Sequence, residues 1–183
     1  ESLYRFIGPP LHESYEKFYS FSREQAMQAV SYYREYYEEK GMFENEVYPG
    51  IKQLLRDLTK QGVLCLVATS KPEIYAKKIL DYYELSNYFY YIAGANMDGT
   101  RTDKAEVIAY ALKQIPAEYS NKKVLMVGDR SHDIIGAKKN GIDCAGVLFG
   151  YGSSEELEEA GADFIADSVE AVRNIILLDT AMN

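Results

Sequence analysis

Apolar and polar positions alternate with two different periods along the second part of the chain, from about residue 47 onward. Ile51, Leu54 and Leu58 recur at helical spacing, whereas residues 63–68 form a continuous apolar run, as expected for a strand buried on both faces. Further helices are predicted from about residue 73 and around residues 107–112, 134–137, 155–159 and 169–178, and further strands at residues 89–93, 124–127, 145–149 and 164–166. Strands that alternate with helices of this length predict an α/β fold, in which helices cover both faces of a parallel sheet.

The first 46 residues follow a different pattern, which is helical and rich in tyrosine. Seven of the 17 tyrosines lie in this part. Ser22 and Gln25 have the spacing of a capping box at the start of a helix, and Gly41 has the position of its left-handed end. We therefore predict two domains, a helical insert over residues 1–46 and an α/β core over residues 47–183.

The amino-acid composition limits the kinds of molecule that the protein can bind. The 183 residues carry 20 basic and 28 acidic side chains, which gives a net charge of −8 with histidine neutral. This acidic balance argues against nucleic acid and against an anionic membrane surface, because both need a basic face. The sequence contains neither a run of about 18 apolar residues nor a recognisable signal peptide. Cys65 and Cys144 lie inside apolar runs, which predicts buried, reduced thiols and favours a cytoplasmic location.

Polar residues follow the first predicted strand, at the edge of the sheet where open α/β folds bind their ligands. The segment Thr69-Ser70-Lys71-Pro72 places two hydroxyls and a cation at the start of a helix. Backbone N–H groups at such a start attract anions, and phosphate is the common one. An ordinary helix cap explains the same residues equally well when this segment is taken alone.

A second polar segment, residues 128–133, follows the strand predicted at residues 124–127 and reads Gly-Asp-Arg-Ser-His-Asp. Asp129 and Asp133 are four residues apart where a strand runs into a helix, so both carboxylates can face one site. Such oxygen ligands suit Mg²⁺, which binds through one or two carboxylates together with a substrate phosphate. The alternative is that both aspartates cap the helix. Lys104 precedes another helix and gains significance only if it points at the same strand ends.

Three short motifs in this order resemble motifs two, three and four of the haloacid dehalogenase-like phosphatase superfamily. They are Thr69-Ser70-Lys71, then Lys104, then Gly128-Asp129 with Asp133. Spacing and strand context match over about residues 47–178. Gly8-Pro9-Pro10-Leu11 within a helical insert is similar to the small α-helical cap of the phosphoglycolate phosphatase-like subgroup, and the residues of the second and fourth motifs also resemble 5′-nucleotidase-like members. The resemblance implies a Rossmann-like parallel sheet and a small α-helical cap that closes over the site.

The resemblance also implies a role for each of these side chains. Thr69, with Ser70 and Lys71, would bind the transferring phosphoryl group. Lys104 would neutralise phosphate charge and orient the nucleophile. Asp129 would ligate Mg²⁺, and Asp133 would complete or support the metal site. Together these groups would supply the charge stabilisation that phosphoryl transfer needs.

The family's first motif is an apolar strand followed by Asp-x-Asp-Gly-Thr, which supplies the aspartyl nucleophile ahead of the cap. The 183 residues contain one Asp-Gly-Thr, at residues 98–100, and it is not that motif, because Asn96 stands in the nucleophile position and the segment follows the second motif. We interpret it as a turn. The sequence begins with Glu1 rather than methionine. We therefore expect the nucleophile and the first strand of the core in a segment upstream of Glu1, and we expect residues 1–183 alone to be inactive.

These observations favour a Mg²⁺-dependent phosphatase of small phosphomonoesters, of the phosphoglycolate or nucleoside 5′-monophosphate type, which acts through an aspartyl-phosphate. One alternative is a sugar-phosphate mutase of the same superfamily, and another is a non-catalytic phosphate-binding or regulatory relative. A receiver or dinucleotide-binding domain is a weaker alternative, since no Gly-x-Gly-x-x-Gly follows the first strand. Arg5 and His12 are candidate substrate contacts within the insert, while the substrate and the oligomeric state stay open.

Overall fold

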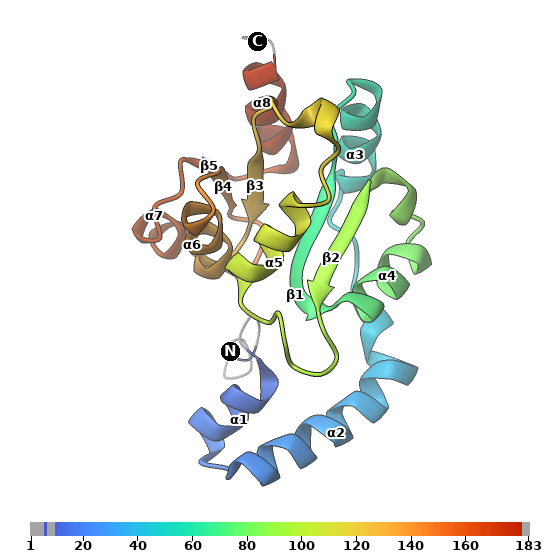
Figure 1. The fold of residues 1–183 in the computed structure, drawn as a ribbon, viewed down its shortest axis with the longest axis vertical. Coiled ribbons are helices and arrows are strands. Elements are labelled where there is room, and N and C mark those ends of the chain that lie inside the picture. Colours follow the sequence, from blue (N-terminus) through green and yellow to red (C-terminus); the bar gives the residue numbers. More distant parts are fainter. Residues whose placement is uncertain (1–5, 7–9, 181–183) are drawn as a thin grey trace.

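The computed structural model describes residue 6 and residues 10–180, with side chains as far as residue 177. Arg5, Gly8 and Pro9 lie outside the described residues. The N-terminal part contains α1 (Leu11–Tyr19), α2 (Arg23–Glu39) and the short 3-10 helix η2 (Gly41–Phe43). Figure 1 shows how the remaining elements alternate, and their bounds are α3 (Ile51–Lys60), β1 (Leu66–Pro72), α4 (Glu73–Tyr82), η3 (Ser86–Tyr88), β2 (Tyr91–Ala95), α5 (Lys104–Leu112), η4 (Ala117–Tyr119), β3 (Leu125–Gly128), α6 (Ser131–Lys139), β4 (Asp143–Val147), α7 (Ser154–Glu159), β5 (Phe164–Ala166) and α8 (Val169–Thr180).

The two ends of α2 are set by different local interactions. At its start the predicted capping box is confirmed, because Ser22 Oγ accepts the Gln25 N–H at 3.2 Å and Gln25 Oε1 accepts the Ser22 N–H at 2.9 Å. The left-handed end predicted at Gly41 is wrong. Lys40 ends the helix with φ −137°, and Gly41 begins η2 instead. This tighter turn places Met42 in the core, where it is completely buried.

The strands form two parallel sheets rather than one. β1 pairs with β2, and the second sheet has the order β3-β4-β5. The first strand lies later than the run predicted at residues 63–68, because its ladder to β2 begins only at Leu66, opposite Tyr91. The register then breaks between Ala68 and Pro72. This irregular stretch contains the Thr69-Ser70-Lys71 segment, which therefore belongs to the end of β1 and not to a loop after it.

Helices cover both faces of the three-stranded sheet, which confirms the predicted fold class. On one face, Leu54 and Leu58 of α3 pack with Val147, Ala166 and Val172 from β4, β5 and α8. On the other face a second cluster joins α6 and α7 to β4 through Ile134, Ala137, Cys144 and Leu157. α5 contacts β1 and β2 and also lies against α6, so it links the two sheets (Figure 1).

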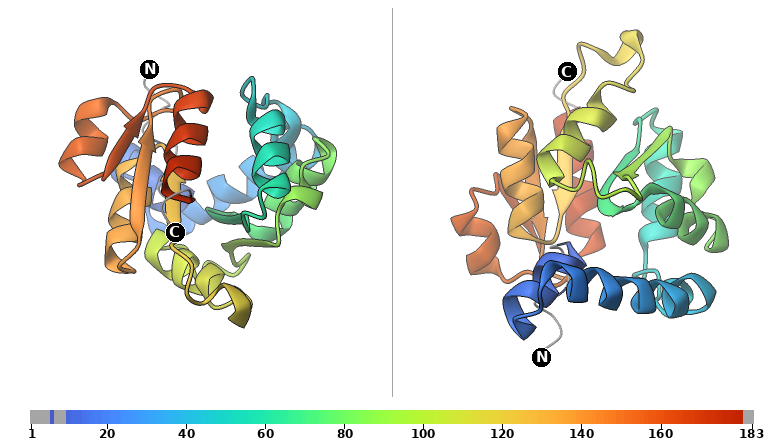
Figure 2. Two further views of the ribbon diagram at one scale, coloured as in Figure 1. Left: turned by 90° about the horizontal axis from the view of Figure 1, so that it is seen from above. Right: turned by 60° about the horizontal axis from the view of Figure 1, so that its bottom comes forward.

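The facing edges of the two sheets have no strand partner among the described residues. Within the described part of the chain, β1 pairs with β2 alone and β3 with β4 alone (Figure 2). The side chains of β1 are accordingly half-buried rather than buried as predicted, and Val127 of β3 is 37% exposed. Unpaired edges present free backbone N–H and C=O groups, so this pair of edges is the place where another strand can join.

The N-terminal helices lie beyond the carboxyl ends of β1 and β2 (Figure 1). α1 and α2 contact each other, and Tyr37 and Met42 pack against Tyr75 of α4, which connects this helical part to the α/β part. None of the helices in the described residues has the length and apolar character required to cross a membrane.

Candidate active site

Lys104 occupies the point where the two sheets come together. It is the first residue of α5, and its Nζ donates to the carbonyl oxygen of Ala68, the last residue of β1 before the register break, at 3.2 Å. The same ammonium group lies 2.8 Å from Oδ1 of Asp133 in α6. Both side chains are largely buried, with 15% and 9% of their surfaces exposed. The structure thus brings three of the sequence-predicted segments together, because Ala68 immediately precedes Thr69.

Asp133 is fixed by the backbone around it as well as by Lys104. Its Oδ2 accepts the N–H groups of Asp129 and Arg130, at 3.1 and 3.2 Å. Gly128 makes this arrangement possible, because a Cβ at that position would lie 2.3 Å from the Cβ of Asp133. The start of α6 therefore closes tightly on the end of β3, and both oxygens of Asp133 are engaged.

Asp129 has a less crowded carboxylate. Its Oδ2 accepts the N–H of Tyr151 at 2.9 Å, and no donor among the described residues contacts Oδ1. The residue lies directly after β3 and is adjacent to Asp133 through the backbone contact described above. The two carboxylates therefore share one end of one strand, as the sequence predicts, but only Asp129 keeps an oxygen available for a ligand.

The Thr69-Ser70-Lys71 segment divides between two environments. Thr69 Oγ1 accepts the Lys71 N–H at 3.2 Å, and both Thr69 and Ser70 are half-buried at the end of β1. The Lys71 side chain turns toward α2, where its Nζ donates to the hydroxyl of Tyr37 at 2.5 Å and lies 4.9 Å from the centre of that ring. Of the residues predicted to bind phosphate, Lys71 is thus the one that contacts the helical part.

Burial shifts the pKa values of both side chains in the Lys71–Tyr37 contact. Although part of the Lys71 side chain is exposed, its ammonium end lies among protein atoms, and loss of solvent lowers the pKa of Lys71 below its usual value. Burial likewise raises the pKa of Tyr37. Tyr37 was not predicted from the sequence, in which it is one of several tyrosines of the N-terminal part and has no distinguishing signal.

Two further groups at this end of the second sheet were also missed. Tyr151 supplies the N–H that holds Asp129, from the loop after β4. Glu156 of α7 accepts the N–H of Ser131 at 2.8 Å and the Arg130 guanidinium at 2.9 Å. Burial opposes its ionisation, but these donors outweigh it and keep the pKa of Glu156 below its usual value. The Gly-Tyr-Gly sequence directly after the strand predicted at residues 145–149 was the available signal for the Tyr151 loop.

A divalent cation fits this site only with help from its substrate. No group of three or more His, Cys, Asp and Glu side chains in the described part of the chain forms a ready-made cation site. Both oxygens of Asp133 are engaged by donors, so Oδ1 of Asp129 is the carboxylate oxygen of this pair that remains available. This donor set is compatible with Mg²⁺, which commonly takes one or two carboxylates and completes its shell with phosphate oxygens and water.

The family model for "haloacid dehalogenase-like hydrolase" matches residues 1–147. A 5′-nucleotidase from Pseudomonas aeruginosa is 39% identical over 176 residues, which cover 95% of this chain and 78% of the relative. The tyrosine-protein kinase PtkA of Mycobacterium tuberculosis is 37% identical over 172 residues, covering 93% of this chain but only 58% of the kinase. A phosphoglycolate phosphatase from Vibrio vulnificus is 27% identical, with 94% and 75% covered.

Solved structures have the same fold. A predicted phosphatase from Clostridium acetobutylicum superposes with a TM-score of 0.88 and 45% identity, over 97% of this chain and 81% of the other. The family resemblance inferred from the three motifs is therefore confirmed.

Proposed function

Because the chain belongs to the haloacid dehalogenase-like hydrolase family, we propose that the intact protein is a Mg²⁺-dependent phosphatase of small phosphomonoesters, of the phosphoglycolate or nucleoside 5′-monophosphate type. The observation that carries this proposal is the position of Lys104. Its ammonium group bridges the end of β1, which leads into Thr69, and Asp133 at the start of α6. A phosphate bound here would meet a cation, two hydroxyls and a metal ligand within one site.

Each group has a distinct task in this proposal. Thr69 and Ser70 bind the phosphoryl oxygens through hydroxyl and backbone donors, while Lys104 neutralises their charge and orients the nucleophile. Asp129 holds Mg²⁺ through its available oxygen, and Asp133 supports that site by fixing Lys104 and the backbone of Asp129. When bound, the cation would offset the charge that develops on the transferring phosphoryl group.

The nucleophile is assigned to a segment upstream of Glu1. The proposal rests on the facing edges of β1 and β3, which have no strand partner among the described residues and flank Lys104. A parallel strand between them would end beside Thr69 and Asp129, which is where an aspartate must lie to attack a phosphate held by Lys104. The aspartyl-phosphate formed in this way would then be hydrolysed by water.

We assign α1 and α2 to the cap, within a domain that ends near residue 46. These helices lie beyond the carboxyl ends of β1 and β2, and Tyr37 contacts Lys71 directly. A cap in this place excludes water from the phosphate site and selects the rest of the substrate. The half-buried Cys65 and the buried Cys144, which are free thiols, are compatible with a reducing, cytoplasmic setting.

The proposal is tested on the intact protein by measuring phosphate release from p-nitrophenyl phosphate, nucleoside 5′-monophosphates and phosphoglycolate, with Mg²⁺ and with EDTA. We expect release only with Mg²⁺. Asp129→Asn should lower kcat by about 100-fold or more, because several kcal/mol of charge stabilisation are lost. Asp143→Asn is the control, because Asp143 is exposed at the start of β4, and it should leave the rate unchanged.

Four results would contradict this assignment. Release that is insensitive to EDTA, or an Asp129→Asn enzyme with the wild-type rate, refutes the metal role. Tight binding of inorganic phosphate without any turnover identifies a non-catalytic relative. Transfer of the phosphoryl group to tyrosine in a protein would identify the activity for which the mycobacterial relative is named.

A further inference from the structure

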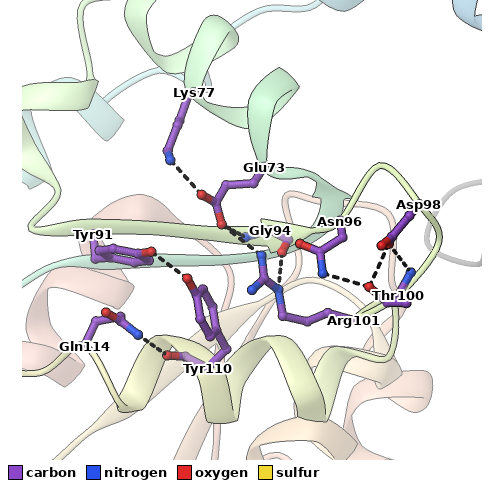
Figure 3. A network of polar contacts seen from close by, with 10 residues as sticks. All are labelled: Glu73, Lys77, Tyr91, Gly94, Asn96, Asp98, Thr100, Arg101, Tyr110 and Gln114. Atoms are coloured by element: carbon purple, nitrogen blue, oxygen red, sulfur yellow. Dashed lines mark hydrogen bonds and ion pairs between the residues drawn. The ribbon is translucent and has the colours of Figure 1, made fainter.

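Arg101 adopts an uncommon conformation in the loop between β2 and α5. Its φ of 51° lies in the left-handed region, which costs a residue with a side chain about 1–2 kcal/mol. The guanidinium is held on three sides (Figure 3). Nε donates to the carbonyl of Gly94 at 2.8 Å, Nη2 lies 3.1 Å from Oε2 of Glu73, and the group stacks 3.7 Å from the centre of the Tyr110 ring. A strained residue that is so completely engaged indicates a site where position matters.

Glu73 is the acidic partner of Arg101, and its position in the chain links this ion pair to the Thr69 segment. It is the first residue of α4 and directly follows the segment Thr69–Pro72. Its carboxylate accepts the Gly94 N–H at 3.3 Å as well as the Arg101 guanidinium, and Lys77 reaches its other oxygen at 2.6 Å. The ion pair therefore joins the polypeptide that follows Thr69 to the loop that precedes Lys104.

The segment after Thr69 also lies very close to β2 at the place where the pair forms. A Cβ on Gly94 would lie 2.6 Å from the Cα of Glu73 and 2.7 Å from the carbonyl oxygen of Lys71. Only glycine fits at such a distance. The side chains of Glu73 and Arg101 are 20% and 18% exposed, so solvent weakens their attraction far less than at an exposed pair.

Two residues separate Arg101 from Lys104, and hydrogen bonds order the chain on either side of this short connection. Before Arg101, Asp98 and Thr100 close the turn, with the Thr100 N–H and hydroxyl donating to Asp98 Oδ1 at 2.9 and 2.7 Å. This turn was predicted from the sequence. After Arg101, Asp103 caps α5 by accepting the N–H groups of residues 105 and 106. Lys104 is the next residue, so fixing Arg101 fixes the origin of its side chain.

We propose that Arg101 and Glu73 form a positioning pair that holds Lys104 and Thr69 at a set separation, so that both reach the same phosphoryl group. This inference rests on the proposed function. Arginine is required, because its planar fork serves the Gly94 carbonyl and the Glu73 carboxylate at once while stacking on Tyr110. A lysine has one ammonium group and cannot make these three interactions at once.

The test is a double-mutant cycle on the intact protein, with p-nitrophenyl phosphate as the probe and assays well below each unfolding midpoint. Arg101→Ala and Glu73→Ala should each lower kcat by about 10- to 100-fold, because a displacement near 1 Å is costly in a phosphoryl-transfer site. Arg101→Lys is the milder variant and should lose part of the rate. Arg173→Ala is the control, since the ion pairs that Arg173 of α8 forms with described residues are those with Glu170 and Asp57, and it should match wild type.

The decisive comparison is made in a Lys104→Ala background. If Arg101 acts through Lys104, then Arg101→Ala should cause little further loss there, since the group that it positions is absent. Equal fold-losses in the two backgrounds would mean that Arg101 acts on general structure, and the inference would be wrong. An Arg101→Ala rate equal to wild type would overturn it as well.

A second measurement does not depend on turnover. The reaction of Lys104 with acetic anhydride, followed by peptide mass spectrometry, reports how firmly its amine is held. Acylation of Lys104 should rise severalfold in Arg101→Ala and Glu73→Ala but not in Arg173→Ala. An unchanged acylation rate would refute the positioning pair. If phosphate release is absent while acylation rises as expected, the proposed function fails and the structural connection to Lys104 stands.

Discussion

At the scale of single residues, the ion pair between Lys104 and Asp133 combines two roles. It contributes to the candidate site, and it also neutralises a carboxylate that is nearly buried. A buried charge that loses its partner costs far more than an exposed one, because no solvent replaces the missing charge. Substitutions at Lys104 must therefore be interpreted for stability and activity together.

Lys104→Met should lower the free energy of unfolding by about 3 kcal/mol and leave a folded protein whose turnover is strongly reduced but still measurable. Lys138→Met is the matched control. Lys138 lies 2.5 Å from Oδ1 of Asp163, but that pair is 40% and 32% exposed, so its loss should cost much less stability than the loss of the Lys104 pair. Urea unfolding of both variants makes the comparison. Equal losses would show that burial of the Lys104 pair has no energetic consequence.

At the scale of secondary-structure elements, α2 depends on the capping box at its start. Ser22→Ala removes the side-chain oxygen that satisfies the Gln25 N–H and should lower stability by about 1 kcal/mol. Ser31→Ala is the control in the same helix. Residue 31 is exposed and interior, so alanine there should be neutral or slightly stabilising. Thermal unfolding measures both, and a loss at Ser31 as large as that at Ser22 would contradict the capping role.

The elements also show what could be predicted from the sequence and what could not. The alternation of helices and strands, and the strand ends that carry Thr69 and Asp129, follow from local periodicity, which the sequence displays directly. The contact of Lys71 with Tyr37 spans 34 positions, and that of Arg101 with Glu73 spans 28. Such contacts depend on how elements pack, so neither Tyr37 nor Glu73 could be assigned a role in advance.

At the scale of the whole molecule, the tyrosines make stability sensitive to alkaline pH. Burial raises the pKa of Tyr33 to about 12. Burial and the hydrogen bond to Glu38 raise the pKa of Tyr75 to about 12. The hydrogen bond to Tyr110, together with burial, raises the pKa of Tyr91 to about 12. In the unfolded chain these hydroxyls ionise near pH 10. Between these values the folded state binds more protons than the unfolded state, so stability falls as pH rises.

We therefore expect the urea midpoint to fall steadily from about pH 10 to about pH 12. Tyr75→Phe removes one of the contributing hydroxyls and should make the fall less steep, while the midpoint near neutral pH reports the separate cost of the lost hydrogen bond. Tyrosinate absorbance, recorded in the same titration, shows when ionisation occurs. A midpoint that does not change over this interval would contradict the raised pKa values.

The division of the strands into two sheets has a consequence for the order of folding. β1 and β2 are joined through α4, and β3, β4 and β5 follow one another through α6 and α7, so each sheet is built from neighbouring parts of the chain. Contacts between nearby segments form quickly, whereas those between distant segments form late. Thr69 belongs to the first unit, Asp129 and Asp133 belong to the second, and Lys104 lies at the start of α5, which connects them. Each unit can fold early by itself, and the candidate site forms only when the two units pack together.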